Sequence, residues 1–121
     1  MVATVGLTPS TAYAEANPPG GCTKGYFCMY SGPNQTGTLL AKKSGEWAAA
    51  TPSQFINGVQ SVFNNGSACW NCDHVDFLFW VPDHNWSVCL HFNPGPGSYK
   101  QNFTNFAGGA IAKSVHWRGE C

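Results

Sequence analysis

Short apolar and aromatic runs alternate with clusters of turn-forming residues along most of this 121-residue chain. The strongest run, residues 75–81 (VDFLFWV), ends at a turn that begins with Pro82. Strand-sized runs at intervals of roughly a dozen residues, separated by Gly, Pro and Asn, are typical of a β-sandwich or Greek-key barrel. A helical turn is expected only within residues 46–55, where Pro52 follows Thr51. The pattern predicts strands over residues 26–30, 38–41, 60–63, 75–81, 88–92 and 114–117.

The second half of the chain repeats the pattern of the first half at an offset of about 50 residues. Residues 29–34 and 79–84 each run from an apolar–aromatic pair into a proline turn, and residues 60–63 correspond to 113–116. Neither half could bury its aromatic face alone. The repeat therefore predicts two four-stranded motifs that form two packed sheets around one shared core.

Composition favours a small β protein with an aromatic core. The chain has 14 glycines, eight prolines and five tryptophans, and only 10% of its residues are charged. Abundant glycine and proline disfavour long helices. Because six Lys+Arg balance six Asp+Glu, we expect no charged surface for a nucleic-acid backbone or an anionic membrane.

Six cysteines in a chain of this size favour a secreted domain held by up to three disulfides. The alternative is a metal site made by Cys69, Cys72 and His74. A structural zinc site needs a second ligand pair at a suitable spacing, and the later cysteines and histidines do not form one. We therefore predict no metal and expect these residues to form disulfides: Cys22, Cys28, Cys69, Cys72, Cys89 and Cys121.

The first residues have features of an export signal. A short apolar run precedes Ala12-Tyr13-Ala14, which has the small-x-small form that signal peptidase accepts, and we expect cleavage after Ala14. The alternative is a disordered arm of the mature chain. In either case the protein is expected to be extracellular. The predicted organisation is a signal-peptide remnant or arm at 1–16, a linker at 17–21, and one domain at 22–121 with motifs at about 22–66 and 73–121.

Two features of the chain resemble known families. The repeated motif, with an aromatic turn early and a Ser-Val-aromatic strand late, resembles the βγ-crystallin fold. Within that fold, Cys22-Thr-Lys-Gly-Tyr-Phe-Cys28-Met-Tyr-Ser-Gly is similar to the opening of the bacterial secreted metalloproteinase inhibitors. The resemblance covers roughly residues 22–121. It implies an all-β, βγ-crystallin-like Greek-key β-sandwich, stabilised by disulfides, in which Cys22 pairs with Cys28.

The resemblance also implies a mechanism, in which a rigid loop enters the protease cleft like a substrate and is cleaved slowly or religated. A pre-ordered loop loses little entropy on binding. In such inhibitors the scissile bond follows a disulfide-bonded cysteine and precedes a branched apolar residue, and the loop closes on a second cysteine a few residues downstream. Cys89 and Leu90 match the P1 and P1′ positions, and leucine at P1′ suits thermolysin-like enzymes, although Asn93-Pro94 stands where the second cysteine would be.

Two other interpretations concern the same question of which loop makes contact. By the internal repeat, Cys89 and Leu90 correspond to Leu39 and Leu40, so they would lie in a strand and face the core. The rival loop is Cys69-Trp70-Asn71-Cys72, which lies between the two motifs. Its Trp70 is the better binding anchor, because tryptophan dominates the binding energy of many protein interfaces. The candidate contact residues are therefore Cys89, Leu90, Trp70 and Asn71.

Neither calcium binding nor catalysis is expected. The βγ-crystallin calcium motif resembles Asn/Asp-Asn/Asp-x-x-Ser/Thr-Ser, whose oxygen atoms suit a hard cation. Residues 57–62 and 110–115 keep few of these positions, so Ser61 and Ser114 are expected to hydrogen-bond to the backbone at corners of the fold. His74 follows Asp73 directly, but no nucleophile stands near them in a recognisable triad.

These features together predict a secreted, non-enzymatic inhibitor of thermolysin-like metalloproteinases. Its expected partner is an extracellular protease, with no cofactor, nucleic acid or membrane. Two alternatives use the same fold. One is an antimicrobial or toxin-associated binding module that displays tryptophans to another secreted or cell-surface protein. The other is a purely structural βγ-crystallin-like protein.

Overall fold

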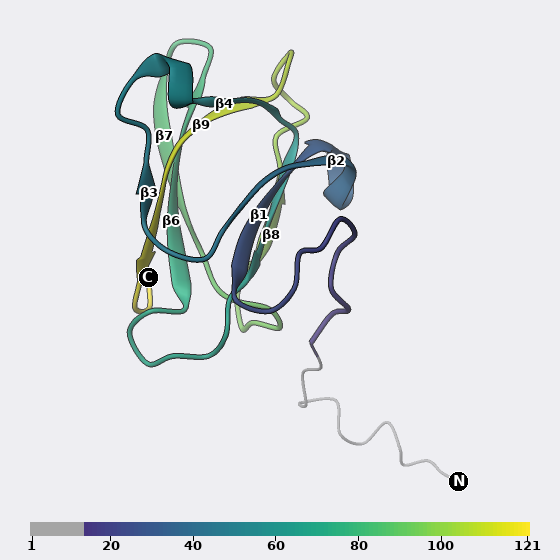
Figure 1. The fold of residues 1–121 in the computed structure, drawn as a ribbon, viewed down its shortest axis with the longest axis vertical. Helices are drawn as coiled ribbons and strands as arrows, with labels where there is room; N and C mark the ends of the chain where they lie inside the picture. Colours follow the sequence, from purple (N-terminus) through teal and green to yellow (C-terminus); the bar gives the residue numbers. More distant parts are fainter. Residues whose placement is uncertain (1–13) are drawn as a thin grey trace, which may run out of the picture.

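A computed structural model describes residues 14–121, and the chain there is all-β, as the hydrophobic pattern predicts (Figure 1). Most of the expected signal-peptide remnant falls on residues 1–13, outside the described residues. Short 3-10 turns form η2 (Pro33–Gln35) and η3 (Pro52–Gln54), and η3 lies in the segment where a helical turn is expected. The strands are β1 (Tyr26–Gly32), β2 (Thr36–Lys43), β3 (Trp47–Ala48), β4 (Ile56–Val59), β5 (Ser61–Asn65), β6 (His74–Val81), β7 (His84–Leu90), β8 (Lys100–Asn102) and β9 (Ala110–Arg118).

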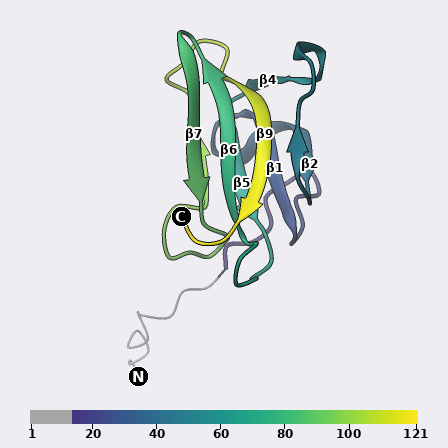
Figure 2. The same ribbon diagram turned by 90° about the vertical axis from the view of Figure 1, so that its left-hand side faces the viewer.

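The strands form two antiparallel sheets that face each other (Figure 2). One sheet has the order β2-β1-β5-β8, and the other has the order β3-β9-β6-β7 with β4 also paired to β9. Each sheet contains a contribution from the other half of the chain. β8 joins the strands of the first half, whereas β3 and β4 join those of the second half. This exchange ties the halves together around one core.

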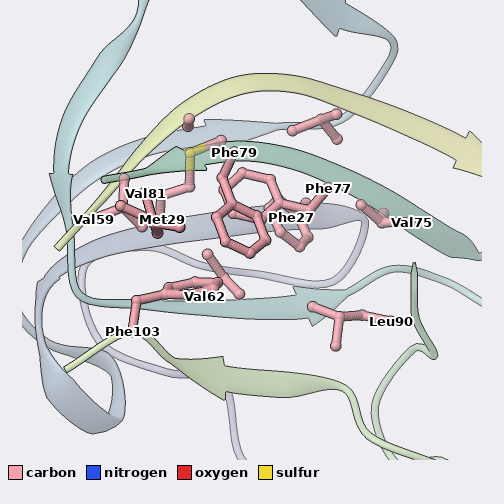
Figure 3. Packing of buried hydrophobic residues seen from close by; sticks show 13 residues of the cluster. Phe27, Met29, Val59, Val62, Val75, Phe77, Phe79, Val81, Leu90 and Phe103 are labelled. Atoms are coloured by element: carbon pink, nitrogen blue, oxygen red, sulfur yellow. The ribbon is translucent and has the colours of Figure 1, made fainter. Parts of the chain in front are cut away.

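The main core fills the space between the two sheets (Figure 3). Alternation along β6 turns Phe77 and Phe79 inward, and Phe27 of β1 meets them from the opposite sheet. The ring centroids of Phe27 and Phe77 lie 5.2 Å apart, and those of Phe77 and Phe79 lie 5.4 Å apart. Aromatic pairs at this separation contribute about 0.5–1.5 kcal/mol beyond the area that they bury. The aromatic core expected from composition therefore lies where the two halves meet.

A second, smaller core covers the outer face of the four-stranded sheet. Cys28 and Tyr30 alternate with the inward residues of β1, so they point away from the sandwich, yet both are fully buried beside Phe63 and Cys22. The chain that precedes β1 supplies the cover. Residues 14–25, here called the N-terminal strap, run across this face. Tyr30 Oη donates a hydrogen bond of 2.6 Å to the backbone carbonyl of Pro19 within the strap.

The strap is also held at its beginning. The backbone N–H of Glu15 donates to Asn93 Oδ1, and Asn93 Nδ2 donates to the Glu15 carbonyl, both at 2.8 Å. The Glu15 carboxylate accepts hydrogen bonds from Tyr99 Oη at 2.8 Å and Lys100 Nζ at 2.7 Å. These two donors, with Lys100 the stronger, hold the pKa of Glu15 below its ordinary value. Residues that the sequence assigns to an arm and a linker thus contact the domain along its first sheet.

Ser61 is a corner residue bonded to the backbone, as the sequence predicts. Its hydroxyl accepts a hydrogen bond of 2.9 Å from the N–H of Gln35 and donates one of 2.7 Å to the carbonyl of Gly32. These bonds fix the turn η2 against the start of β5. The same expectation is wrong for Ser114, which lies within β9 because it pairs with Ala48 of β3 on one side and Leu78 of β6 on the other.

Candidate functional site

Three disulfides divide the cysteines of the chain. Cys22 pairs with Cys28, Cys69 pairs with Cys72, and Cys89 pairs with Cys121. The Cys69–Cys72 disulfide leaves no thiolate at either residue, so the metal site considered for Cys69, Cys72 and His74 loses two of its three ligands. Within residues 14–121, no group of three or more His, Cys, Asp and Glu side chains is placed to hold a metal ion.

The Cys69–Cys72 disulfide closes a tight turn in the connection between β5 and β6. The N–H of Cys72 donates to the carbonyl of Cys69 at 3.4 Å, so the backbone folds back on itself inside the disulfide ring. Trp70, at the tip, is 90% exposed, and Asn71 beside it is also exposed. This loop, residues 69–72, is called the tryptophan loop below. It presents a large apolar side chain on a backbone that the disulfide constrains.

Asp73 anchors the tryptophan loop to the body of the protein. One carboxylate oxygen accepts a hydrogen bond of 2.7 Å from the N–H of Cys69, and the other accepts one of 2.7 Å from His74 Nδ1. Burial alone would raise the pKa of Asp73, but these hydrogen bonds, that from Cys69 first, outweigh burial and hold the pKa below its ordinary value. The carboxylate therefore stays ionised and joins the start of the loop to the start of β6.

Two further contacts hold the tryptophan loop and its anchor against the body of the protein. The His74 ring packs edge-on against the His91 ring, with centroids 4.4 Å apart, so the anchor continues into the body of the sandwich. On the other side the backbone of Asn71 rests on Gly119. A Cβ at Gly119 would lie only 3.2 Å from the Cα of Asn71, so a glycine is what allows the C-terminal segment to run this close to the loop.

Cys89 and Leu90, the other candidate contact residues, lie within β7 and not in a loop. Leu90 has no exposed surface and pairs with Val75 of β6, as the internal repeat suggests for a core position. Cys89 pairs with Asp76 and is bonded to Cys121. The structure thus places the four candidates in two different settings, a buried strand for Cys89 and Leu90 and an exposed loop for Trp70 and Asn71.

The sequence does not predict Asp73 as an anchor, because this residue is considered there only as a possible catalytic partner of His74. A signal for its role does exist. An aspartate directly after a short Cys-x-x-Cys loop can accept hydrogen bonds from the loop's own backbone, as Asp and Asn commonly do in turns.

Taken together, residues 14–121 form a small disulfide-bonded β protein with one exposed tryptophan on a disulfide-closed loop. No helix in residues 14–121 is long and apolar enough to cross a bilayer. Residues 15–74, just under half of the chain, match the model of peptidase inhibitor family I36. This match indicates a peptidase inhibitor and not an enzyme. No curated protein and no solved structure matches the chain.

Proposed function

We propose that this protein is a secreted inhibitor of thermolysin-like metalloproteinases and that the tryptophan loop is the part that enters the enzyme. The observation that carries the proposal is the 90% exposure of Trp70 on a disulfide-closed loop anchored by Asp73. The segment that matches the inhibitor family ends at residue 74, so it includes this loop and its anchor but excludes Cys89 and Leu90.

The tryptophan loop also fits the substrate-like mechanism that the resemblance implies. Cys69 is a disulfide-bonded cysteine, the apolar Trp70 follows it in place of a branched apolar residue, and the loop closes on Cys72 shortly downstream. We place Cys69 at P1 and Trp70 at P1′. Leu90 could fill that role only if β7 left the core, and removing a buried leucine from its packing costs about 2–5 kcal/mol.

Rigidity gives the loop its affinity in this proposal. Ordering a flexible loop on binding costs about 0.5–1.5 kcal/mol for each immobilised side chain, and a loop that is already ordered avoids much of that cost. The disulfide fixes the two ends of the tryptophan loop, and the Asp73 carboxylate fixes its first N–H. After slow cleavage between Cys69 and Trp70 the two new ends would remain joined by the disulfide, which favours religation over release.

The finer fold assignment belongs to the same proposal. We infer a βγ-crystallin-like pair of Greek keys in one domain, residues 22–121, with motifs at about 22–66 and 73–121. Strand order supports this assignment: β2-β1-β5 and β7-β6-β9 have the same arrangement in the two sheets, and each is extended by strands of the other half. Secretion, with cleavage after Ala14, is supported by the three disulfides.

Inhibition assays with single tryptophan variants test the function. The wild-type protein should inhibit a thermolysin-type enzyme at or below micromolar concentration. Trp70→Ala should raise the inhibition constant about 30-fold or more, the effect of losing an interface hot spot. Trp86→Ala is the matched control, because Trp86 is 51% exposed on β7 and lies outside the loop.

The outcomes separate the candidate functions. Lack of inhibition of any metalloproteinase by wild-type protein would overturn the proposal in favour of a binding module for another protein. Inhibition that Trp70→Ala leaves intact would retain the function but remove the tryptophan loop as its site. Incubation with excess inhibitor should also yield a chain cut between Cys69 and Trp70, which mass spectrometry detects as two fragments after reduction.

A further inference from the structure

The tryptophan loop is too small to form a stable complex by itself. A large aromatic side chain buries at most about 250 Å². Specific protein complexes bury about 800 Å² on each partner. Most of the surface that contacts the protease must therefore lie beside the loop, and the shape of the protein around residues 69–72 indicates where.

A groove opens directly next to the loop. Its volume is about 440 Å³, and its walls include Gly25, Gly45, Glu46, Ser67, Cys72 and Trp117. Cys72 belongs both to this wall and to the tryptophan loop, so the two features form one continuous surface. The groove is called the Trp117 groove below, after the one large apolar side chain among its lining residues.

The Trp117 groove is formed before any partner binds. The indole N–H of Trp117 donates to the carbonyl of Gly45 at 3.2 Å, and its backbone N–H donates to the Glu46 carboxylate at 2.7 Å. His116 Nδ1 lies 2.8 Å from the same carboxylate. Behind the ring, Gly66 leaves no room for a side chain, since its Cβ would stand 2.7 Å from Trp117 Cζ3. The indole is thereby fixed in one position, and two segments distant in sequence are joined across the groove.

A second hollow near the loop is less suited to an apolar contact. It holds about 250 Å³ and is lined by groups that include His74, His91 and Glu120. Burying such polar and charged groups against an apolar partner costs free energy unless each finds a hydrogen bond. The Trp117 groove instead offers an indole face and glycines, and the one carboxylate in its wall, that of Glu46, already has partners in Trp117 and His116.

We propose that the Trp117 groove is a secondary contact of the inhibitor and receives an apolar side chain from the protease surface beside the catalytic cleft. This inference rests on the proposed function, because continuity with the tryptophan loop makes the protease the occupant. In this arrangement the tryptophan loop enters the catalytic cleft, and the Trp117 groove binds an apolar side chain at the edge of that cleft. Both contacts form on a surface of the inhibitor that is already ordered.

Filling the groove tests the inference. A Cβ at Gly45 would meet no atom within 4 Å, and its φ lies outside the left-handed region, so Gly45→Phe should fold normally and occupy the groove. We expect the inhibition constant to rise tenfold or more. Ser67→Phe, from another exposed wall residue, should act in the same way and guards against a local effect of the first variant. The matched control is Ser53→Phe in η3, at the opposite end of the molecule (Figure 1), which should change nothing.

Measurement of Trp70→Ala in parallel separates the two proposals. Unchanged inhibition by both groove variants, with weakened inhibition by Trp70→Ala, would overturn the groove and retain the proposed function. Weakened inhibition by the groove variants and by Ser53→Phe alike would also overturn the groove, because a site-specific contact cannot explain it. Absence of inhibition by the wild-type protein would remove the proposed function itself. Each variant is compared at equal folded concentration, established by near-UV circular dichroism.

Discussion

Two short disulfide loops in this protein have opposite relations to solvent. Cys22 and Cys28 have no exposed surface and belong to the smaller core with Tyr30 and Phe63. The Cys69–Cys72 loop projects from the end of the sandwich, and the most exposed large apolar side chain in the described residues, Trp70, stands at its tip. The first disulfide attaches a strap to a sheet, whereas the second shapes a surface.

The difference shows that a disulfide's role depends on what its loop packs against. Around Cys22 the surroundings are structural, since Asn65 Nδ2 donates a hydrogen bond of 2.9 Å to its carbonyl and fixes the strap over β5. Around Cys69, the polar contact that joins the loop to the body is the hydrogen bond to the Asp73 carboxylate. Stability and affinity should therefore respond differently to changes at the two loops.

Removal of the buried disulfide should have the largest effect on stability. In Cys22→Ala/Cys28→Ala the unfolded chain gains freedom, and the smaller core loses packed sulfur atoms, so we expect a loss of about 2–4 kcal/mol in the free energy of unfolding. Urea denaturation measures it. The inhibition constant of the folded fraction should stay within about twofold of wild type; a loss of affinity that matches the loss of stability would contradict the separation of roles.

Removal of the exposed disulfide should reverse the pattern. For Cys69→Ser/Cys72→Ser we expect a smaller stability loss of about 1–2 kcal/mol, because the closed loop is very short and no core packing is lost. Affinity should fall tenfold or more, because the protease must now order the loop on binding. Calorimetric titration should show a more unfavourable binding entropy. Unchanged affinity would mean that the backbone contacts alone hold the loop in place.

Acid should affect the tryptophan loop through Asp73. The pKa of Asp73 is held below its ordinary value of about 4, so its contribution is complete at neutral pH and is lost as pH falls through that lowered pKa. We expect affinity for a catalytically inactive protease to show no Asp73-dependent change between about pH 8 and 5 and to weaken only below about pH 4. Asp73→Ala should bind more weakly than wild type at neutral pH, converge with wild type in acid, and lack the acid transition. A transition that survives in this variant would have to come from another carboxylate.

Much of the fold follows from the hydrophobic pattern because its signals are local. The run at 75–81 becomes β6, His74–Val81. The short strands β3, β4 and β8 are absent from the prediction. Their two to four residues form strands because β9 and β5 offer free edges, which no local pattern records.

The sequence predicts two alternative sites, residues 89–90 and residues 69–72, but it does not decide between them. The sequence of residues 88–90 is compatible both with a loop next to a scissile bond and with a strand. Only the pairing of these residues with β6 makes Leu90 a core residue. The exposure of Trp70 likewise depends on the positions of the end of β5 and the start of β6, which the loop connects. Spacing also left open how four of the cysteines pair, because the partner of Cys89 is the last residue of the sequence, brought close only by β9.

The smallest effect on stability is expected from the loss of one hydrogen bond that holds the N-terminal strap. Tyr30→Phe keeps the ring in the smaller core and removes only the bond from its hydroxyl to the Pro19 carbonyl. We expect a loss of about 0.5–1.5 kcal/mol in the free energy of unfolding, since that carbonyl can regain water at the protein surface.

Tyr26→Phe is the matched control on the same strand. Tyr26 is only partly buried, and Lys42 Nζ lies 4.5 Å from its ring centroid, a contact that phenylalanine preserves. Its stability should change by no more than about 0.5 kcal/mol. Both variants should inhibit the protease as wild type does. If Tyr30→Phe weakened inhibition without lowering stability, the strap would be part of the binding surface, and the division between a structural loop and a recognition loop would fail at the strap itself.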